Sequence, residues 1–123
     1  MSTTCIRVLA DPVQIKECKG TLSRLEGQLD LTTKIFNLAG NAARLKILFL
    51  LHKEGEMCPC DFSDILGISV GGVSQHLRKL KDAGMVRDKK VGQTVFYTMI
   101  PENTQLLLPV LQILSNQSKT ILS

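Results

Sequence analysis

Several patterns are missing from this sequence, and their absence excludes broad classes of protein. No uninterrupted apolar run among the 123 residues is longer than the six residues 106–111, and the N-terminus has no basic segment followed by an apolar one. Membrane-spanning helices need much longer apolar runs, and secretory signals need that N-terminal pattern. We therefore expect neither membrane insertion nor secretion, and a cytoplasmic location.

Recognisable arrangements of catalytic side chains are missing as well. His52 and His76 belong to no nucleophile–base pattern, and the chain lacks a Cys-x-x-Cys redox motif, a phosphate-cradling loop and a catalytic carboxylate pair. A thiol enzyme is therefore the least favoured of the function classes, and we expect that the protein is not an enzyme.

Four cysteines are present, but a disulfide framework is not expected in a reducing compartment. A bridge between Cys58 and Cys60 would also close a very small, strained ring. Each cysteine is therefore either a small apolar packing residue or a thiolate. Thiolates are soft ligands that prefer cadmium, lead, mercury, copper(I), zinc or trivalent arsenic.

The net charge of +4 comes from one segment of the chain. Residues 1–73 hold eight basic and eight acidic side chains, and residues 94–123 hold one of each. Residues 74–93 hold six basic side chains against Asp82 and Asp88. Such a cluster is typical of a surface that contacts phosphates, although a solvated helix face with a charged hairpin would look similar.

Apolar spacing and cap residues predict three helices in the first half of the chain. Asp11 followed by Pro12 indicates a helix start, and this helix is expected to run to about residue 25, before Gly27. A second helix is expected over residues 29–38, ended by Gly40. Asn41 is expected to cap a largely buried third helix over residues 42–53.

Residues 61–83 have the pattern of a helix-turn-helix. Asp61 is expected to cap a short helix that ends at a turn formed by Gly67 and Ile68, and Ser69 is expected to cap a longer one. Apolar residues at spacings of four and three, Val73, Leu77 and Leu80, would face the core. The polar residues between them would then face outward, where they could read a DNA groove.

A β-hairpin is predicted after this helix, because residues 85–91 and 94–100 alternate in polarity around Gly92-Gln93. A hairpin in this position is a wing, and Lys89 and Lys90 near its tip can reach phosphate. The nearly uncharged segment 102–122 predicts an apolar helix suited to dimerisation, with Pro109 in its first turn or at a kink.

These elements predict a mainly α-helical chain with a small β-hairpin: a winged helix-turn-helix in a homodimer. We expect a single domain made of an N-terminal arm and first helix (1–28), a DNA-binding part (29–100) and a dimerisation helix (101–123). The candidate contacts to double-stranded operator DNA are Ser69, Ser74, Gln75, His76, Arg78, Lys79, Lys81, Lys89 and Lys90. For His76 an ordinary place on the helix surface is an equal alternative.

Four segments carry a resemblance to a known family: Arg44-Leu-Lys-Ile-Leu, Glu56-Met-Cys-Pro-Cys-Asp-Phe, Ser74-Gln-His-Leu-Arg-Lys-Leu and Gly84-Met-Val. In this order and register they resemble the ArsR/SmtB family of winged-helix repressors, and the resemblance covers residues 31–100. It implies a homodimeric DNA-binding repressor that leaves its operator when a soft metal or metalloid binds.

Within that family the chain is most similar to the cadmium- and lead-sensing CadC-like branch, whose site joins a Cys-x-Cys pair to cysteines of an N-terminal arm. The resemblance implies Cys58 and Cys60 as ligands, with Cys5 from the arm. Cys18 departs from the pattern, since Leu9 lies nearer the place of the second arm cysteine. Three or four thiolates are therefore both possible. The family's other site, on the C-terminal helix, is not expected, because residues 104–123 contain no His, Asp, Glu or Cys.

Two functions remain after this comparison. The first is a metal-responsive repressor whose effector is a thiophilic ion of the cadmium, lead, mercury, zinc or arsenite class. The second is a winged-helix repressor whose cysteines sense oxidants or reactive sulfur, because both kinds of sensing use accessible thiolates.

Overall fold

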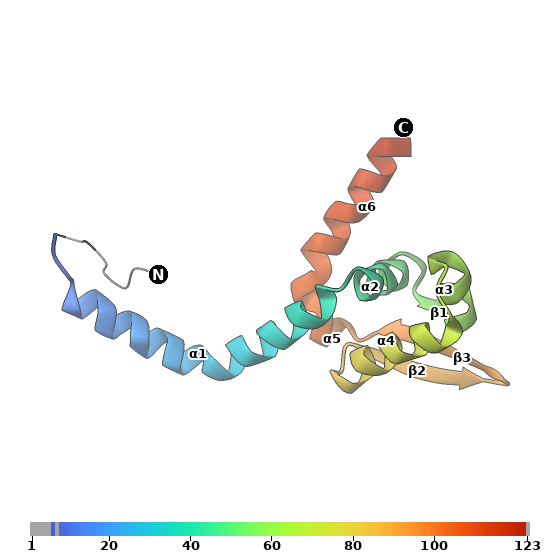
Figure 1. The fold of residues 1–123 in the computed structure, drawn as a ribbon, viewed down its shortest axis with the longest axis horizontal. Coiled ribbons are helices and arrows are strands. Elements are labelled where there is room, and N and C mark those ends of the chain that lie inside the picture. The colour runs from blue at the N-terminus through green and yellow to red at the C-terminus, as the bar shows by residue number, and fades with distance from the viewer. Residues whose placement is uncertain (1–5, 7, 123) are drawn as a thin grey trace. The chain divides into compact units, whose positions relative to one another are not determined.

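The computed structural model describes residue 6 and residues 8–122. The chain divides into two units, with the boundary between Leu31 and Thr32. Residues 1–5, and Cys5 with them, lie outside the described part. The elements are helices and one small antiparallel sheet, labelled in Figure 1. The fold class predicted from the sequence, mainly α-helical with a β-hairpin, is confirmed.

The first helix, α1 (Pro12–Ala39), is one continuous helix. The prediction of two helices separated at Gly27 was wrong. Glycine costs a helix about 1 kcal/mol relative to alanine, but it keeps its N–H, so the hydrogen-bond ladder can continue through it. The start was predicted correctly, because Asp11 Oδ1 accepts hydrogen bonds from the backbone N–H groups of Val13 (3.1 Å) and Gln14 (3.0 Å).

Helix α2 (Ala42–Glu54) is the central helix of the second unit. Asn41 caps it as predicted, accepting a hydrogen bond from the backbone N–H of Arg44 at 3.1 Å, and Gly55 ends it. Its buried residues Ile47, Leu48 and Leu51 join a core to which the later helices also contribute.

The helix-turn-helix and its hairpin follow α2. The helices are α3 (Pro59–Leu66) and α4 (Val70–Asp82), and the strands of the hairpin are β2 (Val86–Val91) and β3 (Thr94–Met99). A short strand that the sequence did not indicate, β1 (Glu56–Met57), pairs with β3, so that the sheet has the order β1-β3-β2. A strand of two residues is too short to show an alternating pattern.

The C-terminal segment has three parts rather than one uniform helix: α5 (Pro101–Thr104), the 3₁₀ turn η1 (Gln105–Leu107) and α6 (Leu108–Leu122). Pro109 lies in the first turn of α6, where its missing N–H costs no internal hydrogen bond. Leu107 and Leu111 are buried in the core, whereas Val110 and Ile113 are exposed. Among the described helices, none is long and apolar enough to cross a membrane.

Two glycines allow a test of the helix boundaries. A Cβ at Gly27 would meet nothing within 4 Å, and the same is true at Gly67, but Gly67 has φ +70° and ends α3 in the left-handed conformation. Gly27→Ala is therefore expected to raise the free energy of unfolding by up to about 1 kcal/mol, whereas Gly67→Ala is expected to lower it by about 1–2 kcal/mol. Denaturant unfolding of the two variants checks this, and a destabilised Gly27→Ala chain would contradict a continuous α1.

Candidate nucleic-acid interface and thiol site

The turn between α3 and α4 is held by short polar contacts. Gly67 adopts a positive φ, the Ser63 hydroxyl donates to the carbonyl of Ile68 at 2.6 Å, and Ser69 caps α4 by accepting a hydrogen bond from the N–H of Gly72 at 3.0 Å. The apolar face of α4 is fully buried at Val73, Leu77 and Leu80. Burial of this face determines which side chains point away from the core.

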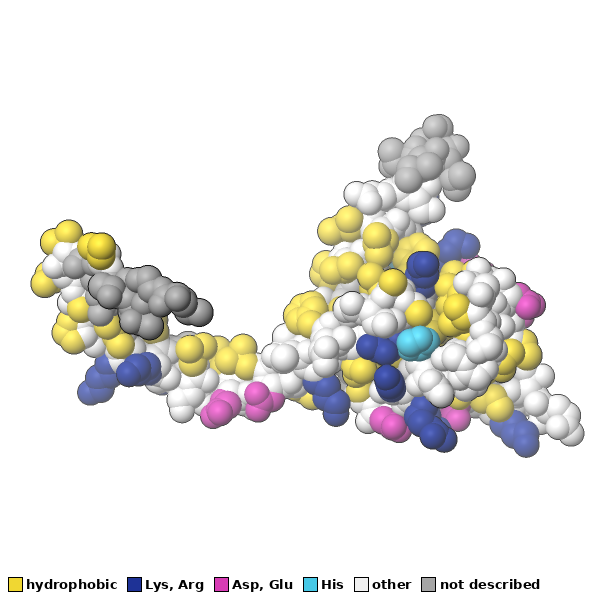
Figure 2. Space-filling model, viewed as in Figure 1, with side chains coloured by type: hydrophobic (Ala, Val, Ile, Leu, Met, Phe, Trp, Pro, Cys, Tyr) yellow, Lys and Arg dark blue, Asp and Glu magenta, His cyan; other side chains and the backbone are white. Residues whose placement is uncertain are grey.

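The remaining side chains of α4 form an exposed polar face, as the sequence predicted. Figure 2 shows Lys and Arg side chains along the edge of this unit that carries α4 and the hairpin. His76 is half-buried at the flank of this face. The other predicted contact residues of α4 and its cap are all exposed: Ser69, Ser74, Gln75, Arg78, Lys79 and Lys81.

The hairpin extends the basic surface beyond α4. Lys89 and Lys90 are exposed on β2, opposite Phe96 and Val95 of β3, and Gly92 makes the turn with φ +62°. These two lysines therefore stand close to the tip of the wing, where the sequence predicted them.

Lys81 differs from the other basic residues because it has an acidic partner in the wing. Its Nζ lies 3.0 Å from Asp88 Oδ2, and this hydrogen bond raises the pKa of Lys81. An exposed pair of this kind contributes little stability. It does connect the end of α4 to β2, and it partly neutralises one of the predicted DNA contacts.

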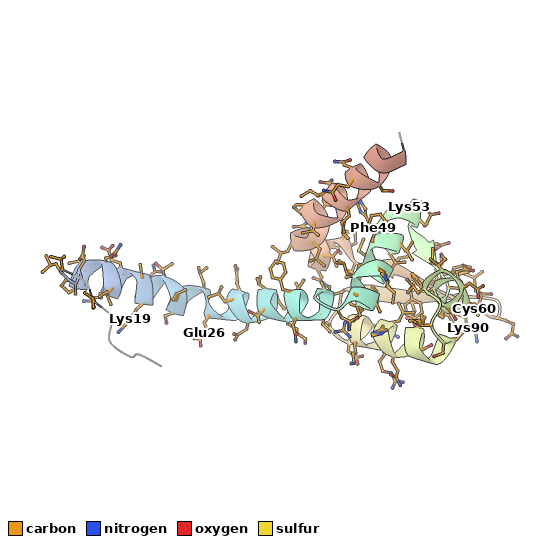
Figure 3. All side chains as sticks on the ribbon, turned by 45° about the horizontal axis from the view of Figure 1, so that its top comes forward. Lys19, Glu26, Phe49, Lys53, Cys60 and Lys90 are labelled. Carbon is orange, nitrogen blue, oxygen red and sulfur yellow. The ribbon has the colours of Figure 1, made fainter. Side chains whose placement is uncertain are left out.

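The cysteine pair lies at the start of α3. Cys58 is the N-cap residue, Pro59 follows at the first helical position and Cys60 is next, exposed to solvent. Figure 3 labels Cys60. The prediction that Asp61 caps this helix was wrong, because proline is favoured at the first helical position and shifts the start by three residues.

Asp61 instead lies in the first turn of α3, where it accepts a hydrogen bond from Cys58 Sγ at 3.2 Å. The spacing of three residues between a cap and an acceptor in the first turn is the signal by which this contact could have been found.

The two thiols of α3 can supply part of a soft-metal site, but not all of it. Cys18 is exposed on α1 within the first unit, and Cys5 lies outside the described residues. In the part of the chain that the structure describes, no three His, Cys, Asp or Glu side chains gather closely enough to hold a metal ion. Cys58 and Cys60 fit the chemistry of a thiophilic ion, and any further ligands have to come from other segments or another protomer.

Arg44 is a residue of the site that sequence reasoning did not identify. Its Nη1 lies 3.4 Å from Nδ1 of His76, across 32 residues of sequence, and its Nε donates to the carbonyl of Leu38 at 2.7 Å. Burial, followed by the charges of Arg44 and Lys79, lowers the pKa of His76. Arg44 belongs to a segment that the sequence singled out, but no local pattern indicates a contact so distant along the chain.

Helix, turn, helix and hairpin in this order, with a basic exposed face on the second helix, define a winged helix-turn-helix protein. Residues 41–88 match the model of the bacterial regulatory protein family named after arsR. The chain belongs to this ArsR family, which is a family of transcriptional regulators and not of enzymes.

Individual relatives support this assignment. The chain is 36% identical over 75 residues to a cadmium resistance regulatory protein CadC homolog of Staphylococcus aureus, covering 61% of this chain and 62% of that protein. It is 30% identical over 79 residues to an arsenic resistance transcriptional regulator of Pseudomonas putida, covering 64% and 69%. The first curated relatives are matched over only 56–62% of their own length.

A solved structure of the same fold is the homodimeric winged helix-turn-helix DNA-binding domain of a possible ArsR-family regulator from Mycobacterium bovis. The sequences are 26% identical, the TM-score is 0.63, and the match covers 76% of this chain and 86% of that one. The likeness therefore extends well beyond the segment matched by the family model.

Substitution of the two adjacent glycines of α4, Gly71 and Gly72, distinguishes a contact with DNA from a structural role in the helix. A Cβ at Gly72 would lie 3.3 Å from Ser69 Oγ and disturb the cap, whereas at Gly71 the nearest atom is 4.0 Å away. We expect Gly71→Ala to leave stability unchanged or raise it by up to about 1 kcal/mol, yet to weaken DNA binding if the DNA backbone approaches this turn. Denaturant unfolding measures the stability of Gly71→Ala, and fluorescence anisotropy with a DNA duplex measures its DNA affinity, with Gly72→Ala as the matched variant in both. Unchanged DNA affinity in Gly71→Ala would remove this turn from the interface.

Proposed function

We propose that this chain is a homodimeric transcriptional repressor that binds operator DNA and is released when a thiophilic metal or metalloid binds Cys58 and Cys60. The observation that carries the proposal is the position of the two thiols, at the N-cap and in the first turn of α3. This helix is the first helix of the DNA-reading unit, so a ligand held there acts directly on that unit.

The exposed face of α4 is suited to a DNA major groove. Ser74, Gln75 and Arg78 are exposed and offer the donors and acceptors that base edges require. Lys89 and Lys90 of the wing are suited to phosphates, which provide affinity without sequence information. In a dimer, two copies of α4 would enter successive major grooves about 34 Å apart.

Apolar surface on η1 and α6 supports a dimer. Leu106, Leu108, Val110 and Ile113 are 41–56% exposed, which is a large apolar surface for one short segment. The Mycobacterium bovis relative is described as homodimeric. We therefore propose that residues 101–123 form a dimerisation segment, beside a DNA-binding part (29–100) and an arm (1–28), although α1 runs through the boundary between the last two.

The chemistry of the thiol pair favours soft ions. The S. aureus relative is named for cadmium resistance and the P. putida relative for arsenic resistance, and both effectors prefer sulfur ligands. The thiol of Cys58 donates a hydrogen bond to Asp61. A metal ion bound to the sulfur would replace the thiol proton and so remove this hydrogen bond at the start of α3. Cys5 and Cys18 are the proposed additional ligands, and a reducing cytoplasm would keep all four thiols available.

A second candidate function is a repressor that senses oxidants or reactive sulfur. The observation that favours it is the exposure of Cys60 in the first turn of α3, where its sulfur is accessible to an oxidant. Native mass spectrometry distinguishes the two functions. A metal ion bound by thiolates adds its mass less that of the displaced protons and leaves the sulfur unoxidised, whereas peroxide or persulfide treatment adds oxygen or sulfur, or removes hydrogen, at the cysteines.

The double variant Cys58→Ser, Cys60→Ser tests the metal function. Serine keeps the size of each side chain but removes the soft ligand, so thiolate-to-cadmium charge-transfer absorption and cadmium-induced release from DNA should both be lost. DNA affinity without metal should stay within about twofold, because both positions are at the surface turn of α3. Ultraviolet absorption and DNA anisotropy during cadmium titration give the two readouts.

Cys18→Ser tests whether the site has three or four thiolates. If the site has three thiolates without Cys18, this variant should respond to cadmium like the unmodified chain, and if the site has four it should respond more weakly. Normal cadmium absorption in the double variant would contradict the proposed site.

A further inference from the structure

One guanidinium joins three helices of the second unit. Arg44 is in the first turn of α2, its Nε donates to the carbonyl of Leu38 near the end of α1, and its Nη1 meets His76 of α4. The distances are 2.7 Å to the carbonyl oxygen and 3.4 Å to Nδ1. Arginine can make both contacts because its donors lie in a rigid planar fork.

The contact with His76 depends on the protonation state of the imidazole. Arginine is a donor without acceptor capacity, so Nδ1 has to offer its lone pair, and the ring proton has to be on Nε2. Protonation of Nδ1 would make His76 a donor with a positive charge, facing the Arg44 guanidinium, which is also a donor with a positive charge. The charged groups that act on His76 are Arg44 from α2 and Lys79 from its own helix, both positive, and together with burial they lower its pKa.

We propose that Arg44 is a positioning residue that fixes the DNA-reading helix α4 to the end of α1 through neutral His76, and that protonation of His76 opens this link. The link itself is a property of the fold, whereas its effect on operator binding rests on the proposed function. The core contacts of Val73, Leu77 and Leu80 hold one face of α4, and the Arg44–His76 contact holds its flank.

The flank contact bears on which bases α4 can read. His76 is adjacent to the exposed Gln75 and two residues from the exposed Arg78. A small rotation of α4 after loss of the link would move these side chains relative to base edges, which require exact donor and acceptor placement. Contacts to phosphates tolerate such a rotation better, because they depend mainly on charge.

Acidification therefore has two effects of different kinds. The additional positive charge on His76 would strengthen binding to any DNA, whereas loss of the link would weaken only sequence-specific binding. The ratio of operator affinity to non-specific affinity should thus fall at a pH below 6.5, the ordinary pKa of histidine, because the lowered pKa keeps His76 neutral until the pH is lower than that value. Folding stability should fall in the same direction, because a lowered pKa in the folded state means that the unfolded chain binds the proton first.

Nuclear magnetic resonance of the full chain without DNA tests the link directly. In the unmodified chain, ¹⁵N shifts of His76 should report the Nε2–H tautomer and a pKa below 6.5, and His52→Asn assigns the signals of the two histidines. In Arg44→Met the pKa should rise toward 6.5 and both tautomers should be populated. In Arg44→Lys the positive charge is kept but one nitrogen cannot reach both partners, so the tautomer preference should weaken there too.

A His76 tautomer and pKa that are the same in the unmodified chain, Arg44→Met and Arg44→Lys would overturn the proposal. Far-ultraviolet circular dichroism of each variant confirms that it is folded at the pH of the measurement. Because the histidine signals are read without DNA, this result does not depend on operator binding.

A double-mutant cycle then measures the effect on DNA reading. Arg44→Met and His76→Gln should each lower operator affinity about fivefold. The double variant should lower it by no more than the more damaging single variant does, because both substitutions remove the same link. Losses that multiply in the double variant would show that Arg44 does not act through His76. If the unmodified chain binds no specific DNA, the proposed function fails while the histidine titration still decides the link.

Discussion

Burial of one face of α4 is the constraint on which the rest of the DNA-reading unit depends. Val73, Leu77 and Leu80 are fully buried, and each such side chain contributes on the order of 1.5–3 kcal/mol when it leaves water. The exposed Lys81–Asp88 pair contributes at most about 1 kcal/mol. Packing therefore sets the orientation of α4, and the polar contacts adjust it at its flank and at its end.

Helix α3 connects the thiol pair to α4. Cys58 caps α3 and Cys60 lies in its first turn, Phe62 of the same helix is fully buried in the shared core, and Ser63 donates to the carbonyl of Ile68 in the turn that leads to α4. Under the proposed function, a change at the first turn of α3 would reach α4 through these close-packed side chains. Allosteric coupling typically amounts to only about 1–3 kcal/mol, so a small change in the tilt of α4 is sufficient.

Local patterns predicted much of this fold. The caps Asn41 and Ser69, the apolar spacing of α4 and the Gly92 turn each reflect a local rule, and the structure confirms them. The errors arose where two local rules compete: Gly27 weakens a helix without ending it, and Pro59 took the helix start from Asp61.

Contacts between different helices and strands were beyond sequence reasoning. The pairs Arg44–His76 and Lys81–Asp88, and the strand β1, depend on how elements pack, which no spacing rule contains. The exposed basic residues were found because charge is visible in the sequence. The whole ligand set, Cys58 and Cys60 included, stays a prediction; of the other two cysteines, Cys5 is outside the described residues and Cys18 belongs to the other unit.

We propose that a thiol-bound ion and operator DNA each weaken the binding of the other to this protein. Cadmium affinity of the free protein and of its operator complex, measured together with operator affinity with and without cadmium, tests this coupling. Linkage requires both ratios to be equal, and a coupling of about 1–3 kcal/mol corresponds to roughly five- to 150-fold. We expect equal ratios in that range. Cadmium affinity that is identical with and without operator would show that the thiol site is structural and that the chain is not a metal-operated switch.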